Sequence, residues 1–276
     1  MAMVTGVSWT RSTFNPWIGC TKIGLGCDHC YAEAQDARFY QSAHWGPGAP
    51  RLLTKDRNWQ QPVLWNRLAM ESGEFWPVFC ASQADVFDNE VPQEWRDRLW
   101  ALIKATPALT WQLVTKRVGN VQKMLPADWG DGYPNVWLIA TVVNQEEAER
   151  DIPKLKSIPA PVHGLSIEPM LGSIDLTVAD RRHGNRLIDD IEWVIIGGES
   201  RQPGAPARDF DLSLAELLLD QCAQAGVPVF FKQMGHAPVR HRKKVAFTGK
   251  GVDLAEWPEH FRKQAFPQGR ELALAA

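Results

Sequence analysis

The chain has 276 residues, of which 45% are hydrophobic and 22% charged, and its formal net charge is -2. These values exclude a disordered or fibrous protein and an electrostatic footprint for nucleic acid over the whole molecule. The first residues lack the charged start and apolar block of a secretory signal, and no stretch is apolar enough to cross a membrane. We therefore expect a cytoplasmic protein with no membrane segment. Its five cysteines are then expected to bind metal or react rather than form disulfides.

Three of these cysteines, Cys20, Cys27 and Cys30, lie in the segment FNPWIGCTKIGLGCDHCY at 14–31, just after the first expected strand at 11–15. Their spacing, C-x6-C-x2-C, offers no clear fourth ligand, which a structural zinc site needs. A four-iron cluster bound by three thiolates leaves one iron open for a cofactor or substrate. A zinc site with an unidentified fourth ligand remains the alternative. Cys80 and Cys222 lie in apolar segments and are expected to be buried.

Short apolar runs rich in β-forming residues recur along the chain, separated by segments with helical periodicity such as 92–106 and 211–226. This alternation predicts a parallel sheet that is buried on both faces. Without a dinucleotide-binding glycine pattern at the first turn, a barrel is favoured over an open sheet. We predict a partial (β/α) barrel of the TIM type, with about six to seven parallel strands and the cysteine loop after the first. The expected strands after the first are 77–87, 110–117, 136–143, 161–169, 193–200 and 227–235.

Nothing in the sequence divides the chain into two domains, so residues 1–276 are expected to form one. An insertion at about 39–67, rich in glycine, proline and tryptophan, is expected between the first helix and the second strand. A basic extension is expected at about 236–276.

Polar side chains stand at the carboxyl ends of the expected strands, which is where barrels of this kind build their active sites. Charged groups next to apolar strands need partners or a ligand, so we predict catalytic roles for Lys116, Glu168 and Lys232. Mutual pairing of lysine and glutamate is the structural alternative. The two glycines at 197–198 would let backbone N–H groups approach a ligand closely.

The cysteine block resembles the radical S-adenosylmethionine (SAM) superfamily, and more closely the phage-associated three-cysteine-motif family. Further segments carry the same resemblance: QADVF at 83–87, LVTKR at 113–117, IEPMLG at 167–172, WVIIGGES at 193–200 and FFKQMG at 230–235. Two features differ from the superfamily's usual pattern. The first cysteine gap is six residues rather than three, and the Gly-Gly-Glu triplet follows the sixth strand rather than the second.

The resemblance implies a [4Fe-4S] cluster bound by Cys20, Cys27 and Cys30. Its open iron would bind SAM, and one electron from an external donor such as flavodoxin or ferredoxin would cleave SAM to a 5'-deoxyadenosyl radical. That radical would abstract hydrogen from a substrate. The predicted SAM contacts are Ser82, Asp85, Glu168, Gly197, Gly198 and Glu199.

A nucleotide or a base in nucleic acid, as in phage DNA modification or repair, is our first substrate hypothesis. It depends on the basic run HAPVRHRKKVAFTGKG at 236–251 and on Arg117. The contacts predicted in that run are Arg240, Arg242, Lys243 and Lys244. A solvated loop is the structural alternative for the run. The other functional alternatives are a radical enzyme acting on a peptide or small molecule, and a non-catalytic zinc-binding module.

Overall fold

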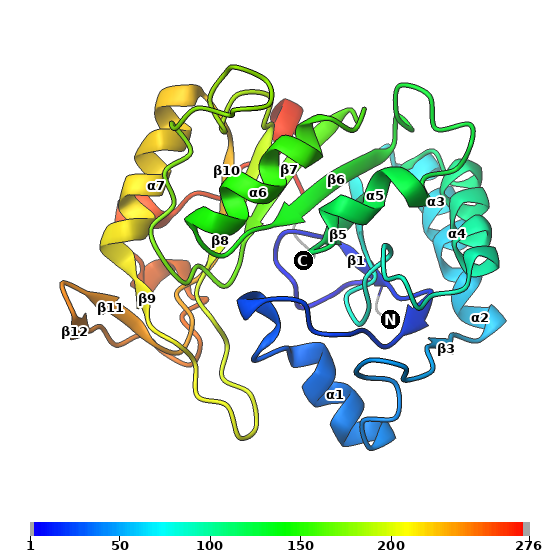
Figure 1. The fold of residues 1–276 in the computed structure, drawn as a ribbon, viewed down its shortest axis with the longest axis horizontal. Helices are drawn as coiled ribbons and strands as arrows, with labels where there is room; N and C mark the ends of the chain where they lie inside the picture. Colours follow the sequence, from blue (N-terminus) through cyan, green and yellow to red (C-terminus); the bar gives the residue numbers. More distant parts are fainter. Residues whose placement is uncertain (1–2, 273–276) are drawn as a thin grey trace.

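A seven-stranded parallel sheet forms the centre of the molecule in the computed structural model, which describes residues 3–272 (Figure 1). The strands pair in chain order, and β1 and β10 are the two unclosed edges. The protein is therefore a partial α/β barrel, and each of the seven predicted strands is confirmed. The strands are β1 (Ser12–Phe14), β4 (Trp76–Cys80), β5 (Leu109–Thr115), β6 (Val136–Thr141), β7 (Val162–Ile167), β8 (Trp193–Gly197) and β10 (Val229–Gln233).

Helices connect these strands and cover the outer face of the sheet (Figure 1). Asn144 and Asp211 start two of them, because each side chain accepts a hydrogen bond from the first turn of its helix. The helices are α1 (Tyr31–Tyr40), α2 (Asp56–Trp59), α3 (Gln61–Ser72), α4 (Gln93–Ala105), α5 (Val118–Met124), α6 (Gln145–Lys156) and α7 (Leu212–Ala225). In the described part of the chain, none of them is long and apolar enough to cross a membrane.

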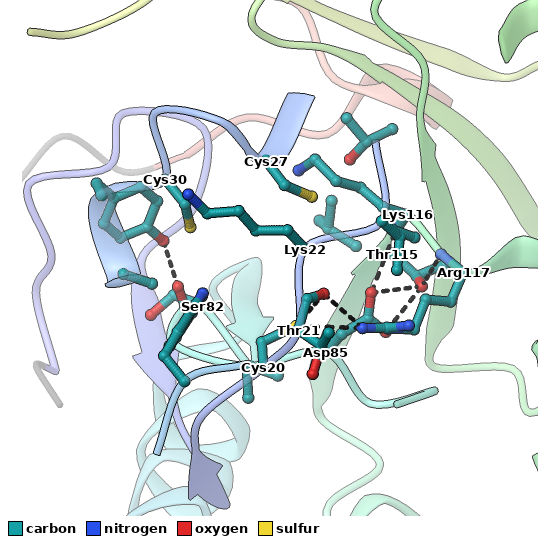
Figure 2. A pocket seen from close by; sticks show the side chains of 18 of the residues that line it. Cys20, Thr21, Lys22, Cys27, Cys30, Ser82, Asp85, Thr115, Lys116 and Arg117 are labelled. Atoms are coloured by element: carbon teal, nitrogen blue, oxygen red, sulfur yellow. Dashed lines mark hydrogen bonds between the residues drawn. The ribbon is translucent and has the colours of Figure 1, made fainter. Parts of the chain in front are cut away.

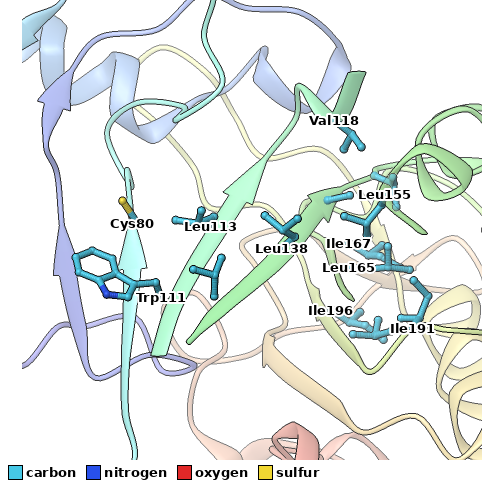
Figure 3. Close-up of a cluster of buried hydrophobic side chains, with 14 of the residues drawn as sticks. Cys80, Trp111, Leu113, Val118, Leu138, Leu155, Leu165, Ile167, Ile191 and Ile196 are labelled. Atoms are coloured by element: carbon cyan, nitrogen blue, oxygen red, sulfur yellow. The ribbon is translucent and has the colours of Figure 1, made fainter. Parts of the chain in front are cut away.

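The two faces of the sheet are packed differently, because successive side chains along a strand point to opposite sides. On the outer side, residues such as Leu113, Leu138 and Ile196 pack with helix residues in the main core (Figure 3). The inner side is filled by a second cluster that includes Trp137 and Trp193. Further along the strands, toward their carboxyl ends, the inner positions become polar.

Short elements complete the fold. The pair β2 (Trp17–Ile18) and β3 (Leu52–Leu53) ties the cysteine loop to the predicted insertion. A small sheet joins β9 (Phe210–Asp211), which directly precedes α7, to β11 (Pro238–Arg240) and β12 (Lys243–Lys244), the first strands of the C-terminal extension. The last four residues of that extension lie outside the described range. The remaining elements are the 3-10 turns Leu25–Cys27, Leu254–Glu256, Glu259–Phe261 and Pro267–Gly269.

Candidate functional site

The loop after β1 brings three thiols to one cavity at the carboxyl ends of the strands. Cys20, Cys27 and Cys30 all line this cavity of about 120 Å3, which we call the cysteine cavity (Figure 2). Cys27 ends the 3-10 turn Leu25–Cys27, and Cys30 immediately precedes α1. The other two cysteines, Cys80 and Cys222, are buried as predicted.

The three thiols surround the cavity without converging on one point. Within residues 3–272, no three His, Cys, Asp or Glu side chains are placed to hold a single metal ion. The thiolates of an iron-sulfur cluster bind different irons, so this donor set fits a cluster better than a closed zinc site. Burial raises the pKa of Cys20 to about 12 and also raises the pKa of Cys30. Metal binding would therefore have to displace thiol protons.

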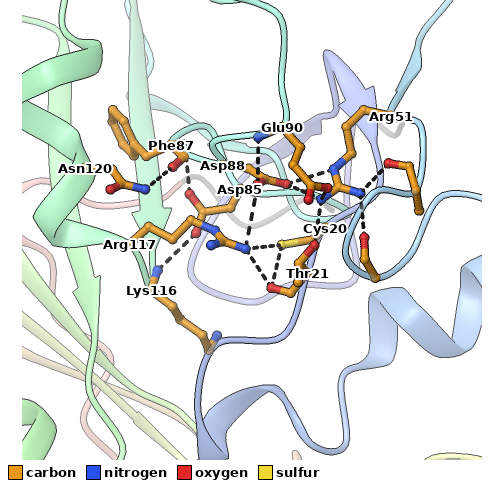
Figure 4. Close-up of polar contacts among 12 residues, drawn as sticks. Cys20, Thr21, Arg51, Asp85, Phe87, Asp88, Glu90, Lys116, Arg117 and Asn120 are labelled. Atoms are coloured by element: carbon orange, nitrogen blue, oxygen red, sulfur yellow. Dashed lines mark hydrogen bonds and ion pairs between the residues drawn. The ribbon is translucent and has the colours of Figure 1, made fainter.

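Buried ion pairs hold the loop at Cys20 (Figure 4). Arg117 Nη2 donates hydrogen bonds to Cys20 Sγ at 3.7 Å and to the Thr21 carbonyl at 2.6 Å. The fully buried Arg51 side chain donates to Asp88 Oδ2 and to Thr21 Oγ1, each at 2.8 Å. Asp88 is itself 3.8 Å from Arg117 Nη2, so the two arginines share one carboxylate. The network fixes Cys20 and directs an N–H donor at its sulfur.

Ser82 and Asp85 also line the cysteine cavity, but their hydrogen-bonding capacity is used inside the protein. Asp85 is buried, and its carboxylate accepts from Thr115 Oγ1 at 2.8 Å and from the Lys116 backbone N–H at 3.1 Å. The Ser82 hydroxyl lies 3.0 Å from Asn15 Nδ2, which donates to it. Their contact with a cofactor stays a prediction, and the observed role of Asp85 is to fix the end of β5.

A second cavity, of about 500 Å3, lies inside the partial barrel, and we call it the barrel cavity. Trp9 and Phe79, whose ring centroids are 4.7 Å apart, form part of its apolar lining. Its size is typical of small-ligand sites. The residues lining both cavities are Cys30, Tyr31, Phe79, Val114, Lys116 and Thr141. The two cavities therefore adjoin one another at the carboxyl ends of the strands.

The ends of β7, β8 and β10 form the far wall of the barrel cavity. Lys232 Nζ lies 2.5 Å from Glu168 Oε1, so the predicted lysine–glutamate pairing exists for these two residues. Glu199 is buried and accepts from Arg208 Nη2 at 2.5 Å and lies 2.9 Å from His29 Nδ1. Burial alone would raise the pKa of Glu199, but the hydrogen bonds from Arg208 and His29 hold it below its usual value. Both oxygens of Glu199 are thus already engaged.

The predicted residues of the basic run separate in the structure. Arg240 Nη2 is 2.6 Å from Glu216 Oε1, so its charge is compensated within the protein. Arg242, Lys243 and Lys244 are exposed at the β11–β12 turn, and none of them lines either cavity. Their contact with nucleic acid stays a prediction. Of the lysines and arginines at 236–251, only Lys250 lines the barrel cavity, and His236 of the same run lines it as well.

Two arginines near the site, Arg51 and Arg208, are indicated by no motif or strand end in the sequence. Arg51 lies in the insertion, and Arg208 lies in the connection between β8 and β9. Arg208 Nη1 also donates to the Leu25 carbonyl at 2.9 Å, which joins the far wall to the cysteine loop. Both lie outside the periodic segments, and their partners are far away in sequence. The positions of the strand ends therefore could not indicate these two arginines.

Comparisons with known proteins give a family but no curated counterpart. No curated protein matches the chain. A double mutant of spore photoproduct lyase with bound AdoMet and dinucleoside spore photoproduct is 11% identical, with a TM-score of 0.42 over 67% of this chain and 55% of that one. Spore photoproduct lyase complexed with dinucleoside spore photoproduct is also 11% identical, with a TM-score of 0.41 over 75% of this chain and 59% of that one. The chain thus spans less than two thirds of either structure. A family model described as "Protein of unknown function (DUF5131)" matches residues 4–262, so the chain belongs to that family.

Proposed function

We propose that the protein is a radical SAM enzyme whose [4Fe-4S] cluster is bound by Cys20, Cys27 and Cys30. The observation that carries the proposal is the position of the three thiols, on the loop after β1, around a cavity that adjoins the barrel cavity. The nearest further ligand by sequence, His29, has its Nδ1 next to Glu199. Three thiolates without a fourth are the donor set of a cluster with one open iron.

When bound, the cluster would supply one electron, received from an external donor such as flavodoxin or ferredoxin, for the cleavage of SAM to a 5'-deoxyadenosyl radical. Lys116 lines both cavities and has no acidic ion-pair partner among residues 3–272, so it suits the carboxylate of SAM. Glu168, Gly197, Gly198 and Lys232 would orient SAM or substrate from the far wall. Trp9 and Phe79 would limit the access of water to a reactive intermediate.

The first experiment is anaerobic reconstitution with iron and sulfide, in the presence of dithionite and SAM. We expect a brown protein with about four irons per chain that forms 5'-deoxyadenosine only when dithionite is present. Cys27→Ala should lose most of the iron and all of this activity. Cys222→Ala is the matched control, because this buried thiol of α7 lines neither cavity.

Unchanged iron content in Cys27→Ala would refute the assignment of the ligands. A colourless protein with one zinc per chain would support the zinc-binding module instead. Both outcomes are read from metal analysis and the absorption spectrum, independently of any substrate.

A further inference from the structure

Three chain segments meet backbone to backbone at the far wall of the barrel cavity. The Gly198 N–H donates to the Gln233 carbonyl at 3.0 Å, and the Gly235 N–H donates to the Lys250 carbonyl at 3.0 Å. A Cβ on Gly198 would lie 2.3 Å from the Met234 carbonyl oxygen, so only glycine allows this approach. The C-terminal extension is therefore attached to the ends of β8 and β10. This attachment places Lys250 in the cavity wall.

The far wall carries positive charge that the protein does not compensate. Lys232 is paired with Glu168, and Glu199 is paired with Arg208. By contrast, neither Arg201 nor Lys250, which both line the cavity, has an acid within ion-pair distance in the described part of the chain. Burial lowers the pKa of Lys250 and the neighbouring Lys232 lowers it further, whereas the charge of Glu168 acts in the opposite direction without reversing the shift. Arg201 is exposed and Lys250 is half-buried, and both lie near His236. Two neighbouring cations without acidic partners attract an anion.

Neutral polar groups on the same wall also lack partners. His236 Nδ1 accepts a hydrogen bond from the Arg201 backbone N–H at 3.1 Å, so the neutral ring carries its hydrogen on Nε2 as a donor. Gln233 is only 2% exposed and donates from Nε2 to Gly198 O and Ser200 Oγ. Its Oε1 is buried and has no hydrogen-bond partner. A buried acceptor of this kind is costly unless a ligand supplies the donor.

We propose that Arg201, His236 and Lys250 bind a phosphate group of the substrate, while Gln233 Oε1 accepts a hydrogen bond from the same molecule. The proposal rests on the proposed function, because it assigns the substrate class of that enzyme: a phosphorylated small molecule of nucleotide size. Three side-chain donors at separate positions in the chain can each reach a different oxygen of a phosphate. A planar carboxylate has only two oxygens, and one arginine can bind both.

The location of this wall distinguishes the phosphate site from the expected SAM site. Arg201, His236 and Lys250 line the barrel cavity but not the cysteine cavity, whereas Lys116 lines both. The volume of about 500 Å3 is typical of sites for small ligands, which favours a small phosphorylated molecule over a polynucleotide.

The test measures binding of inorganic phosphate to the reconstituted full-length protein by phosphorus NMR, with acetate and a mixture of the four nucleoside 5'-monophosphates as competitors. We expect Lys250→Met to weaken phosphate binding about tenfold or more and Lys250→Arg to restore most of it. Lys123→Met, at an exposed lysine of α5 that lines neither cavity, should bind phosphate like the wild type. The nucleoside monophosphates should displace phosphate, and acetate should not.

Several results would overturn the proposal: no phosphate binding at millimolar concentration, equal binding by wild type and Lys250→Met, or an equal loss in Lys123→Met. Displacement by acetate would point to a carboxylate site. Competition by an oligonucleotide without terminal phosphates that equals that of the monophosphates would refute the small-molecule class. Thermal unfolding of each variant verifies that it is folded.

Iron content, measured on the same samples, separates the two proposals. Phosphate binding that depends on Lys250 in a protein without a cluster would refute only the proposed function. A full cluster in a protein that binds no phosphate would refute only the substrate class.

Discussion

The walls of the two adjoining cavities differ in how their charges are compensated. Around Cys20, Arg51 from the insertion joins Asp88, which follows β4, and Arg117, which follows β5, in a buried network in which the opposite charges contact one another (Figure 4). At the ends of β8 and β10, Arg201 and Lys250 face the barrel cavity without acidic partners among the described residues. The wall around Cys20, which we call the compensated wall, can hold a fixed group in place before a ligand binds. The wall with Arg201 and Lys250, which we call the uncompensated wall, gains ionic interactions only when a ligand binds.

The largest effect is expected from breaking the compensated wall. Arg51→Met would leave Asp88 buried without its main partner, which typically costs about 3–5 kcal/mol of unfolding free energy. Urea unfolding measures this loss. Arg67→Ala is the control, because Arg67 is 68% exposed and 3.8 Å from Glu71, and should change stability by less than about 0.5 kcal/mol. If the two variants unfold alike, the Arg51 network does not stabilise the cysteine loop.

A smaller effect is expected from replacing Arg208, which links the far wall to the cysteine loop. Arg208→Met removes hydrogen bonds to Glu199 and Leu25, with an expected loss of about 1.5–3 kcal/mol at neutral pH. The lowered pKa of Glu199 means that the paired carboxylate stabilises the wild type above its unfolded pKa. This stabilisation is lost as the pH falls through the lower folded pKa.

The unfolding free energy of wild type should therefore decrease more steeply than that of Arg208→Met as the pH falls from neutral toward acid. Chemical unfolding at a series of pH values gives both curves. Parallel curves would show that the link between Glu199 and Arg208 does not contribute to the acid sensitivity of the protein.

The smallest expected effect comes from disturbing the geometry of the uncompensated wall. Gly198→Ala places a Cβ against the Met234 carbonyl, and we expect a loss of about 1–3 kcal/mol together with weaker phosphate binding. Gly119→Ala, in α5, meets no atom within 4 Å and should be neutral or slightly stabilising. Phosphate binding that survives Gly198→Ala unchanged would mean that the approach of β8 to the C-terminal extension does not shape the wall.

Much of the fold could be predicted from the pattern of apolar residues. A buried parallel strand has a sequence of mostly apolar residues. All seven predicted runs form strands of one sheet, in chain order. The same pattern placed Lys116, Glu168 and Lys232 at the carboxyl ends of strands, and all three line the barrel cavity. The roles of these residues in catalysis stay predictions.

The partners of the charged residues could not be predicted in the same way. The sequence predicted Glu199 as a SAM contact and Arg240 as a contact for nucleic acid, and both contacts stay predictions. It did not indicate that Glu199 pairs with Arg208 or that Arg240 pairs with Glu216. Arg208 and Glu216 follow no strand and carry no motif. An ion pair depends on which surfaces come into contact, and that information is absent from the local pattern.

The sequence by itself determined the order of strands and helices and the gathering of three thiols in one loop, because periodicity and short-range spacing are local properties. Only the tertiary structure decided which charges are compensated. It brings Arg51, from the insertion, to the cysteine loop, and Lys250, from the C-terminal extension, to the end of β10. Compensation of charge requires contact across the fold, so the difference between the two walls exists only once the sheet has formed and the connecting segments have packed onto its carboxyl edge.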